Sequence, residues 1–121
     1  MVKTGKIYFI DDDLIYTGLR QPKKGEVHVI EKIENVIVDM NMIKFYIPTY
    51  DIGDGLTLSY NINMTKNDTG TKYAGKYTLA TDAEYIGDVF CDLFENEKKY
   101  FLYGTWMEDE GIFTWWAIIE K

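Results

Sequence analysis

Apolar and polar side chains alternate along much of this chain, and a period of two residues is that of a β-strand rather than a helix. In the clearest run, residues 56–64, every second side chain is apolar: Leu56, Leu58, Tyr60, Ile62 and Met64. This run predicts a half-buried antiparallel strand. Residues 43–47 alternate in the same way. We expect Pro48 to end their strand at an edge or a bend, because proline cannot donate a ladder hydrogen bond.

The N-terminal part has a less regular pattern. Residues 6–10 and 14–17 predict a short hairpin. Residues 26–40 are too long for one ordinary strand, and their alternation changes phase along the way. We therefore expect either a β-bulge near Glu31 or two strands in succession, with a helix over residues 29–35 as the alternative.

The C-terminal third is the most regular part. Polar turns separate four predicted strands, near residues 73–81, 84–95, 99–107 and 112–120. If the last turn spans residues 108–111, the final hairpin has a defined register: Met107 lies opposite Ile112, Trp106 opposite Phe113 and Gly104 opposite Trp115. In that register the ring of Trp115 would cover the bare glycine, which is a known way to offset a glycine within a strand.

Three glycines stand inside these strands, flanked by aromatic side chains: Gly75, Gly87 and Gly104. Glycine weakens a strand unless the strand must bend or another backbone must come close. Its repeated use indicates strands that bend sharply, as those of a small closed barrel do. The pattern as a whole predicts one all-β domain over residues 1–121, an antiparallel up-and-down β-barrel or barrel-like sandwich of about eight strands.

The predicted C-terminal strands are apolar on both faces, although a barrel wall needs only one apolar face. The second face is distinguished by its aromatic side chains, which are Phe90, Phe94, Phe101, Tyr103 and Trp116. An exposed apolar patch of that size is unusual on a monomer, so something should cover it. Either residues 26–40 fold over it, or it is an interface with a second copy or another protein, and we favour a homodimer.

Three acids share this second face in the predicted register: Asp88, Asp92 and Glu108. Buried carboxylates are costly unless they are paired, so these acids favour an interface over a core. We expect Asp88 and Asp92 to lie at the rim of that interface or to meet one of three lysines, Lys76, Lys98 or Lys99.

The formal net charge is −7, from 20 acidic and 13 basic residues. A negative field opposes binding to nucleic acid and to anionic membranes, so we expect neither partner. Cys91 is the single cysteine, so no internal disulfide can form. The sequence has neither the pattern of a signal peptide nor an apolar stretch of membrane-spanning length. These features predict a cytoplasmic protein.

No residues form a catalytic or metal-binding signature. His28 is the only histidine and is expected to face solvent, so a histidine-rich metal site is excluded by count. Cys91 falls among the inward residues of its strand and is predicted to be buried and unreactive. Asp51 and Asp54 lack the further ligands of a calcium loop. We therefore expect no catalytic residue, no metal and no cofactor.

Two segments carry a pattern centred on glycine. Tyr73–Tyr77 reads aromatic-x-Gly-x-aromatic, and Leu102–Trp106 ends in Gly-x-Trp. In these segments the C-terminal part of the chain resembles the small β-barrels of the lipocalin and avidin superfamily. The resemblance implies a barrel with a ligand site at its mouth, but no particular ligand and no site residue. In lipocalins the Gly-x-Trp signature lies on the first strand, whereas here it lies on the predicted penultimate strand.

Three functions stay open. The third in rank is an enzyme whose catalytic residues cannot be recognised in the sequence. The first is a non-catalytic barrel that holds a small aromatic or amphipathic ligand in its interior, because buried phenols and indoles need hydrogen-bond partners. The walls of that site would be Tyr60, Tyr77, Trp106 and Trp115. A packed aromatic core is the alternative to a pocket. The second function is an acidic interaction or inhibitor module that docks through the second face.

Overall fold

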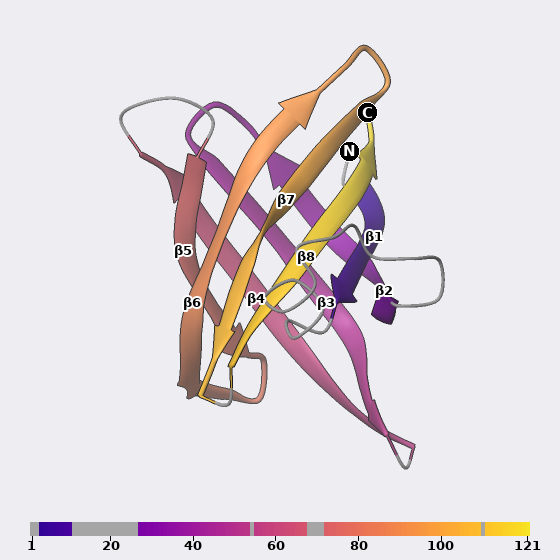
Figure 1. The fold of residues 1–121 in the computed structure, drawn as a ribbon, viewed down its shortest axis with the longest axis vertical. Helices are drawn as coiled ribbons and strands as arrows, with labels where there is room; N and C mark the ends of the chain where they lie inside the picture. The colour runs from indigo at the N-terminus through magenta and orange to yellow at the C-terminus, as the bar shows by residue number, and fades with distance from the viewer. Residues whose placement is uncertain (1–2, 11–26, 54, 68–71, 110) are drawn as a thin grey trace.

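The chain folds into a closed antiparallel β-barrel, seen in the computed structural model as a twisted cylinder of strands (Figure 1). The structure describes residues 3–10, 27–53, 55–67, 72–109 and 111–121. These ranges contain eight strands: β1 (Lys3–Ile10), β2 (Val27–Val38), β3 (Met42–Gly53), β4 (Leu56–Lys66), β5 (Lys72–Leu79), β6 (Asp82–Glu95), β7 (Lys99–Glu108) and β8 (Gly111–Glu120). The predicted all-β up-and-down barrel is confirmed, whereas the predicted strand at 14–17 lies outside the described residues.

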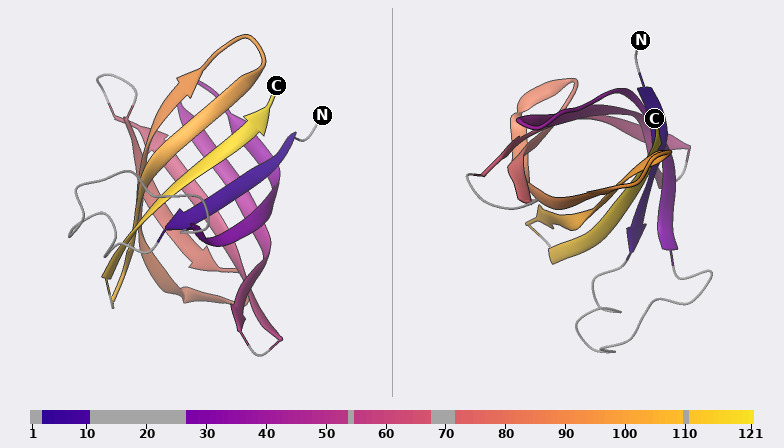
Figure 2. Two further views of the ribbon diagram at one scale, coloured as in Figure 1. Left: turned by 45° about the vertical axis from the view of Figure 1, so that its right-hand side comes forward. Right: turned by 90° about the horizontal axis from the view of Figure 1, so that it is seen from above.

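Every strand pairs with its neighbours in sequence, and β1 pairs with β8 to close the barrel (Figure 2). The closing pair runs from Gly5 opposite Ile119 to Ile10 opposite Thr114. Closure leaves no sheet edge among the described strands. Their backbone donors and acceptors are therefore engaged within the barrel and are not free to pair with another chain.

The barrel has two different ends. One end, at the top of Figure 1, carries the turns that follow β2 and β6, and we call it the upper mouth. The opposite end carries the turns that follow β5 and β7, and we call it the lower mouth. Because strands alternate in direction, each mouth is built from the ends of some strands and the beginnings of others.

The inward side chains form one continuous apolar core. The predicted alternation of β4 is confirmed for Tyr60, Ile62 and Met64, which are all buried, whereas Leu56 at the start of the strand is 60% exposed. The C-terminal strands contribute Tyr73, Tyr77, Val89, Cys91, Leu102, Trp106, Trp115, Ala117 and Ile119. Because these residues come from strands all around the barrel, the core is drawn from the whole barrel wall rather than from one sheet face. Burial of each large apolar side chain contributes roughly 1.5–3 kcal/mol to stability.

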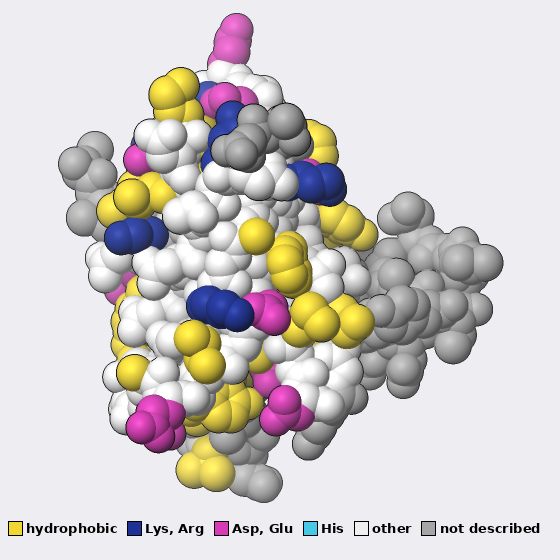
Figure 3. All heavy atoms as spheres, turned by 90° about the vertical axis from the view of Figure 1, so that its left-hand side faces the viewer, with side chains coloured by type: hydrophobic (Ala, Val, Ile, Leu, Met, Phe, Trp, Pro, Cys, Tyr) yellow, Lys and Arg dark blue, Asp and Glu magenta, His cyan; other side chains and the backbone are white. Residues whose placement is uncertain are grey.

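The second face of the C-terminal strands points outward, as the alternation predicts. Phe90, Phe94, Phe101 and Tyr103 are 41%, 52%, 37% and 45% exposed. On the side of the barrel that carries β5 and β6, apolar side chains are interspersed with lysines and acids (Figure 3). Residues 27–38, the intrachain alternative for covering this face, form β2 in the barrel wall between β1 and β3.

The predicted register of the final hairpin is confirmed, with Met107 opposite Ile112, Trp106 opposite Phe113 and Gly104 opposite Trp115. The cover of Gly104 by the Trp115 ring stays a prediction. A Cβ at Gly104 would lie 2.7 Å from Cα of Cys91 and would overlap the carbonyl oxygen of Phe90. The backbone of β6 occupies the place of a side chain, so only glycine fits there.

An aromatic cover over glycine does occur between β5 and β6. Tyr77 lies opposite Gly87 in the ladder, and its ring fills the space that a side chain at Gly87 would need. At Gly75 the reason is the same as at Gly104: a Cβ would lie 2.7 Å from Cα of Met64 in β4. A Cβ at each of these three glycines would therefore collide with a neighbour, which is the backbone of the adjacent strand at Gly75 and Gly104 and the ring of Tyr77 at Gly87.

Pro48 does not end its strand, contrary to the sequence prediction. β3 continues through it to Gly53, and the pairing with β4 shifts between Ile47 and Tyr50. This irregularity accommodates a residue that has no N–H to donate. The carbonyl of Pro48 is still satisfied, because Ser59 donates a hydrogen bond of 2.6 Å to it from Oγ.

Residues 27–38 form one strand, so the helix and two-strand alternatives are wrong. The predicted bulge exists but lies beyond Glu31. The pairing of β2 with β3 shifts between Glu34 and Ile37, and Asn35 has a φ of 54°. Asparagine tolerates this left-handed conformation better than most residues. The bulge shifts the alternation by one residue, so that Ile33 and Val36, three positions apart, are both buried in the core.

We expect Gly104→Val to destabilise the protein by about 3 kcal/mol, because the side chain would collide with the backbone of β6. Gly111→Ala is the matched control, since a Cβ at Gly111 meets nothing within 4 Å. Urea unfolding followed by tryptophan fluorescence compares the two variants with the parent. If Gly104→Val unfolds at the same urea concentration as the parent, this close approach does not constrain the barrel.

Candidate functional site

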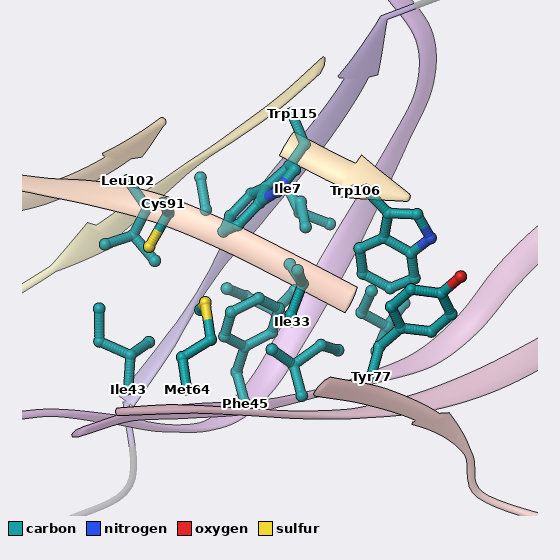
Figure 4. Close-up of a cluster of buried hydrophobic side chains, with 14 of the residues drawn as sticks. Ile7, Ile33, Ile43, Phe45, Met64, Tyr77, Cys91, Leu102, Trp106 and Trp115 are labelled. Carbon is teal, nitrogen blue, oxygen red and sulfur yellow. The ribbon is translucent and has the colours of Figure 1, made fainter. Parts of the chain in front are cut away.

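The structure brings three of the four predicted ligand-binding residues together. Tyr77 and Trp106 are stacked with ring centroids 3.9 Å apart, and Tyr60 meets Trp106 edge-on at 5.3 Å. Trp115 lies apart from them in the core, where its ring is 5.9 Å from that of Phe45 (Figure 4). The four side chains are no more than 4% exposed. They contact other core rings, which is how an eight-stranded barrel fills its interior.

Glu108 holds the polar ends of this aromatic cluster. Its carboxylate accepts hydrogen bonds from Trp106 Nε1 at 2.8 Å and from the Tyr85 hydroxyl at 3.1 Å. The Tyr77 hydroxyl donates to the carbonyl of Met107 at 2.5 Å. The prediction that Glu108 shares the second face is therefore wrong, because it lies on the same side of β7 as Trp106. The polar groups of Tyr77 and Trp106, which suggested a ligand pocket, thus find partners inside the protein.

Trp115 differs from Tyr77 and Trp106, because its Nε1 is buried and has no hydrogen-bond partner among the described residues. A buried donor without a partner costs roughly 1–3 kcal/mol. The indole is fully buried at 0% exposure and packs beside Phe45. Its ring volume offsets that cost by filling the core between β8 and β3.

Burial raises the pKa of the phenols near the lower mouth. The pKa of Tyr50 rises to about 12 through burial and then through the negative charges of Glu108 and Glu31. The pKa values of Tyr60 and Tyr77 are raised first by burial and then by the charge of Glu108. These phenols are protonated at neutral pH and so are poor bases and nucleophiles there.

Cys91 is a core residue, as predicted. Its side chain is 4% exposed, and burial, followed by the charge of Asp92, raises the pKa of its thiol to about 12. A thiol that stays protonated and inaccessible is inert at neutral pH. Among the described residues, no group of three or more His, Cys, Asp or Glu side chains could hold a metal ion. The side chain of His28 lies outside the described part of the structure.

The upper mouth contains a pocket of about 380 Å³ that the sequence did not reveal. Buried or half-buried side chains form its floor, and charged side chains form its rim: Val38, Tyr73, Leu93 and Tyr100 lie below Lys66 and Glu95. The volume lies within the range of about 300–1,000 Å³ that is usual for small-molecule sites. The signal in the sequence was weak, because the lining residues are dispersed over five different strands and the turn after β2.

Three interactions fix the shape of the upper-mouth pocket. The Tyr73 hydroxyl donates a hydrogen bond of 2.9 Å to the carbonyl of Asp39 in the turn after β2. Lys121 Nζ donates to Glu95 Oε2 at 2.6 Å and lies 4.8 Å from the centroid of the Tyr100 ring. The two tyrosines are thus held in place by the protein itself.

The acids of the second face are paired within the chain. Asp88 forms an ion pair with Lys76, one of the lysines named from the sequence. Asp92 pairs instead with Lys72, at 3.5 Å. Both pairs are largely exposed, and exposed pairs contribute little to stability. They do reduce the charge of this face, so that exposed aromatic rings alternate with neutralised pairs.

Comparison with protein-family models, with curated proteins and with solved structures found no match to this chain. The class of protein is therefore defined by its own geometry: a small, closed, up-and-down β-barrel of eight described strands. This architecture agrees with the barrel that the resemblance to lipocalins and avidin implies, and it assigns no family. In the ranges that the structure describes, no helix could cross a membrane.

We expect the protein to lose stability above about pH 10. Phenols in the unfolded chain ionise near that pH, whereas those of Tyr60 and Tyr77 stay protonated in the folded protein, where their pKa is raised. Stability is thus complete below pH 10 and falls as the pH rises, by up to about 1.4 kcal/mol per pH unit for each such phenol. Urea unfolding across this pH range, with phenolate absorbance, measures the slope. Ionisation of all ten tyrosines near pH 10 with the fold intact would contradict it.

Proposed function

We propose that this protein is a non-catalytic binding protein that takes a small amphipathic ligand at its upper mouth. The observation that carries the proposal is the contrast between the two ends of the interior. Aromatic rings in mutual contact fill the core from its middle to the lower mouth, whereas the upper mouth opens into a pocket of about 380 Å³. Barrel mouths are common ligand sites. A ligand placed among Tyr60, Tyr77, Trp106 and Trp115 would have to displace packed rings.

The lining of the pocket indicates the chemistry of its ligand. Tyr73, Leu93 and Tyr100 offer apolar and aromatic surface, so the inner part of the ligand should be a ring or a short apolar chain. Lys66 and Glu95 at the rim suit a polar, uncharged or zwitterionic end. A phosphorylated ligand fits poorly, because no arginine lines this pocket among the described residues.

Binding should depend on the tyrosine that faces the pocket and not on its outward neighbour. We expect Tyr100→Ala to weaken binding of a ligand about tenfold through loss of ring contact. Tyr103→Ala, on the outer surface of the same strand, should leave affinity unchanged. Native mass spectrometry shows any ligand carried by the purified protein. Thermal-shift screening with small aromatic and amphipathic compounds finds ligands to compare across the variants.

Two results would count against a ligand at the upper mouth. If Trp106→Phe abolishes binding while Tyr100→Ala does not, the ligand occupies the interior site first expected from the sequence. If neither mass spectrometry nor the screen finds a ligand, the upper mouth is a structural cleft and the second candidate function takes first place.

The second candidate is an acidic interaction module, favoured by the exposed aromatic rings of the second face. Phe94 and Phe101 lie opposite each other with ring centroids 6.4 Å apart, and Tyr103 stacks on Phe101 at 6.5 Å. A closed barrel can recognise a partner only through its side chains. The exposed aromatic rings of the second face could pack against the same rings of a second copy of this chain. We also propose that neither nucleic acid nor a membrane is a partner, given the charge of −7, and that the protein is cytoplasmic.

Sedimentation at micromolar concentration should show a dimer of the parent chain. Phe90→Glu should give a folded monomer, because a carboxylate would then be buried against the partner without a counter-charge. Ile37→Glu is the control, since Ile37 is 48% exposed on β2, on the opposite side of the barrel. A parent that sediments as a monomer, or an Ile37→Glu variant that dissociates equally, would contradict the homodimer.

A further inference from the structure

Two lysines with the same charge stand side by side on the outside of the barrel. Lys6 of β1 lies directly opposite Lys32 of β2 in the ladder, and both are exposed. Like charges in this position destabilise a strand pair. Neither lysine forms an ion pair with an acid in the part of the chain that the structure describes. In a chain with a net charge of −7, an uncompensated pair of cations is unexpected.

The lysine pair borders a groove of about 570 Å³ on the outer surface of β1, β2 and β8. Apolar side chains line the groove next to the lysines, namely Tyr8, Ile30 and Ile118. The Tyr8 ring stacks on the ring of Trp116, with the two centroids 5.2 Å apart and the ring planes inclined by 16°. The groove therefore combines positive charge at one place with a rigid apolar surface beside it.

Other charges at the groove do not compensate the lysine pair. Lys99 and Glu120 also line it, and they pair with each other, since the ammonium of Lys99 is 3.5 Å from the carboxylate of Glu120. Glu31 borders the groove, but in the ladder it lies opposite Ile7, which is fully buried. Residues that lie opposite each other point to the same side of the sheet, so Glu31 is on the inward side of β2 and the lysines are on the outward side. The groove shares no lining residue with the pocket of the upper mouth.

We propose that this groove binds a small amphipathic anion, with its carboxylate between Lys6 and Lys32 and its apolar body on Tyr8 and Ile118. The bound carboxylate would relieve the repulsion between the two ammonium groups, and the apolar body would cover exposed surface. A small molecule suits the site better than a peptide strand, because a closed barrel has no edge to extend. An anionic bilayer is disfavoured, because the whole protein repels it.

Octanoate, octanamide and acetate are the probes that separate charge from apolar contact. Isothermal titration calorimetry should show binding of octanoate, and much weaker binding of octanamide and of acetate. The double variant Lys6→Gln, Lys32→Gln should bind octanoate about tenfold more weakly than the parent. Lys44→Gln, a change of the same charge on β3, should bind octanoate as the parent does.

Tryptophan emission locates the bound octanoate. Trp106 and Trp115 are buried in the core, whereas Trp116 is half-buried against Tyr8 at the groove, so binding should change the emission of the parent. Trp116→Phe should lose this change while calorimetry still detects binding. Tyr100→Ala should leave octanoate binding unchanged, which keeps this site distinct from the proposed upper-mouth site.

Several outcomes would overturn the proposal. They are equal affinity for octanoate and octanamide, undiminished affinity in the double lysine variant, or loss of octanoate binding in Tyr100→Ala. Flotation with phosphatidylglycerol vesicles tests whether the lysine pair binds a membrane surface instead of a small anion. Binding to these vesicles that depends on Lys6 and Lys32, without measurable affinity for octanoate, would assign the lysine pair to a membrane surface instead.

Discussion

The pairing of β1 with β8 is the interaction on which the rest of this structure depends. Without it, both strands would be open edges, and the apolar core would be exposed to water along one side. With it, the eight described strands must bend around a closed interior. That curvature brings the backbone of β6 against Gly104 and that of β4 against Gly75, so closure explains why glycine stands at these places.

Closure of the barrel also restricts the surfaces at which this protein can bind a ligand or a partner. A barrel of this size fills with side chains, and here large aromatic rings do most of the filling. Trp106 contacts both Tyr60 and Tyr77, and Glu108 satisfies its indole N–H. The ladder engages the backbone of the described strands. What is left for recognition is the upper mouth and the outer surface, where side chains alone supply chemistry.

Local patterns in the sequence were enough to predict much of the fold. Alternation placed Tyr60, Ile62 and Met64 inside the barrel and Phe90 and Phe94 outside it. The turn at 108–111 set the register of the last hairpin. These predictions succeed because the inward and outward sides of a strand, and the pairing across a tight turn, are decided by residues that are close in sequence.

Features that depend on distant residues could not be predicted in this way. The neighbour of Gly104 is the backbone of β6, which no pattern around residue 104 reveals. Glu108 is a different case, because its assignment to the outer face was inconsistent with the alternation of β7, which places it on the same side as Trp106. The upper-mouth pocket does depend on distant residues, since its lining is dispersed along the chain.

The same closing pair has a consequence for how the chain reaches its native state. Every other pairing among the described strands joins consecutive strands, and from β2 onward the strands follow one another closely in sequence, so those hairpins can form with little loss of chain entropy. The ladder between β1 and β8 joins the two ends of the sequence, and this largest entropic cost falls on a single step. The barrel should therefore behave during folding as an open, curved sheet for most of its assembly, with its core sealed from water only when the first and last strands meet.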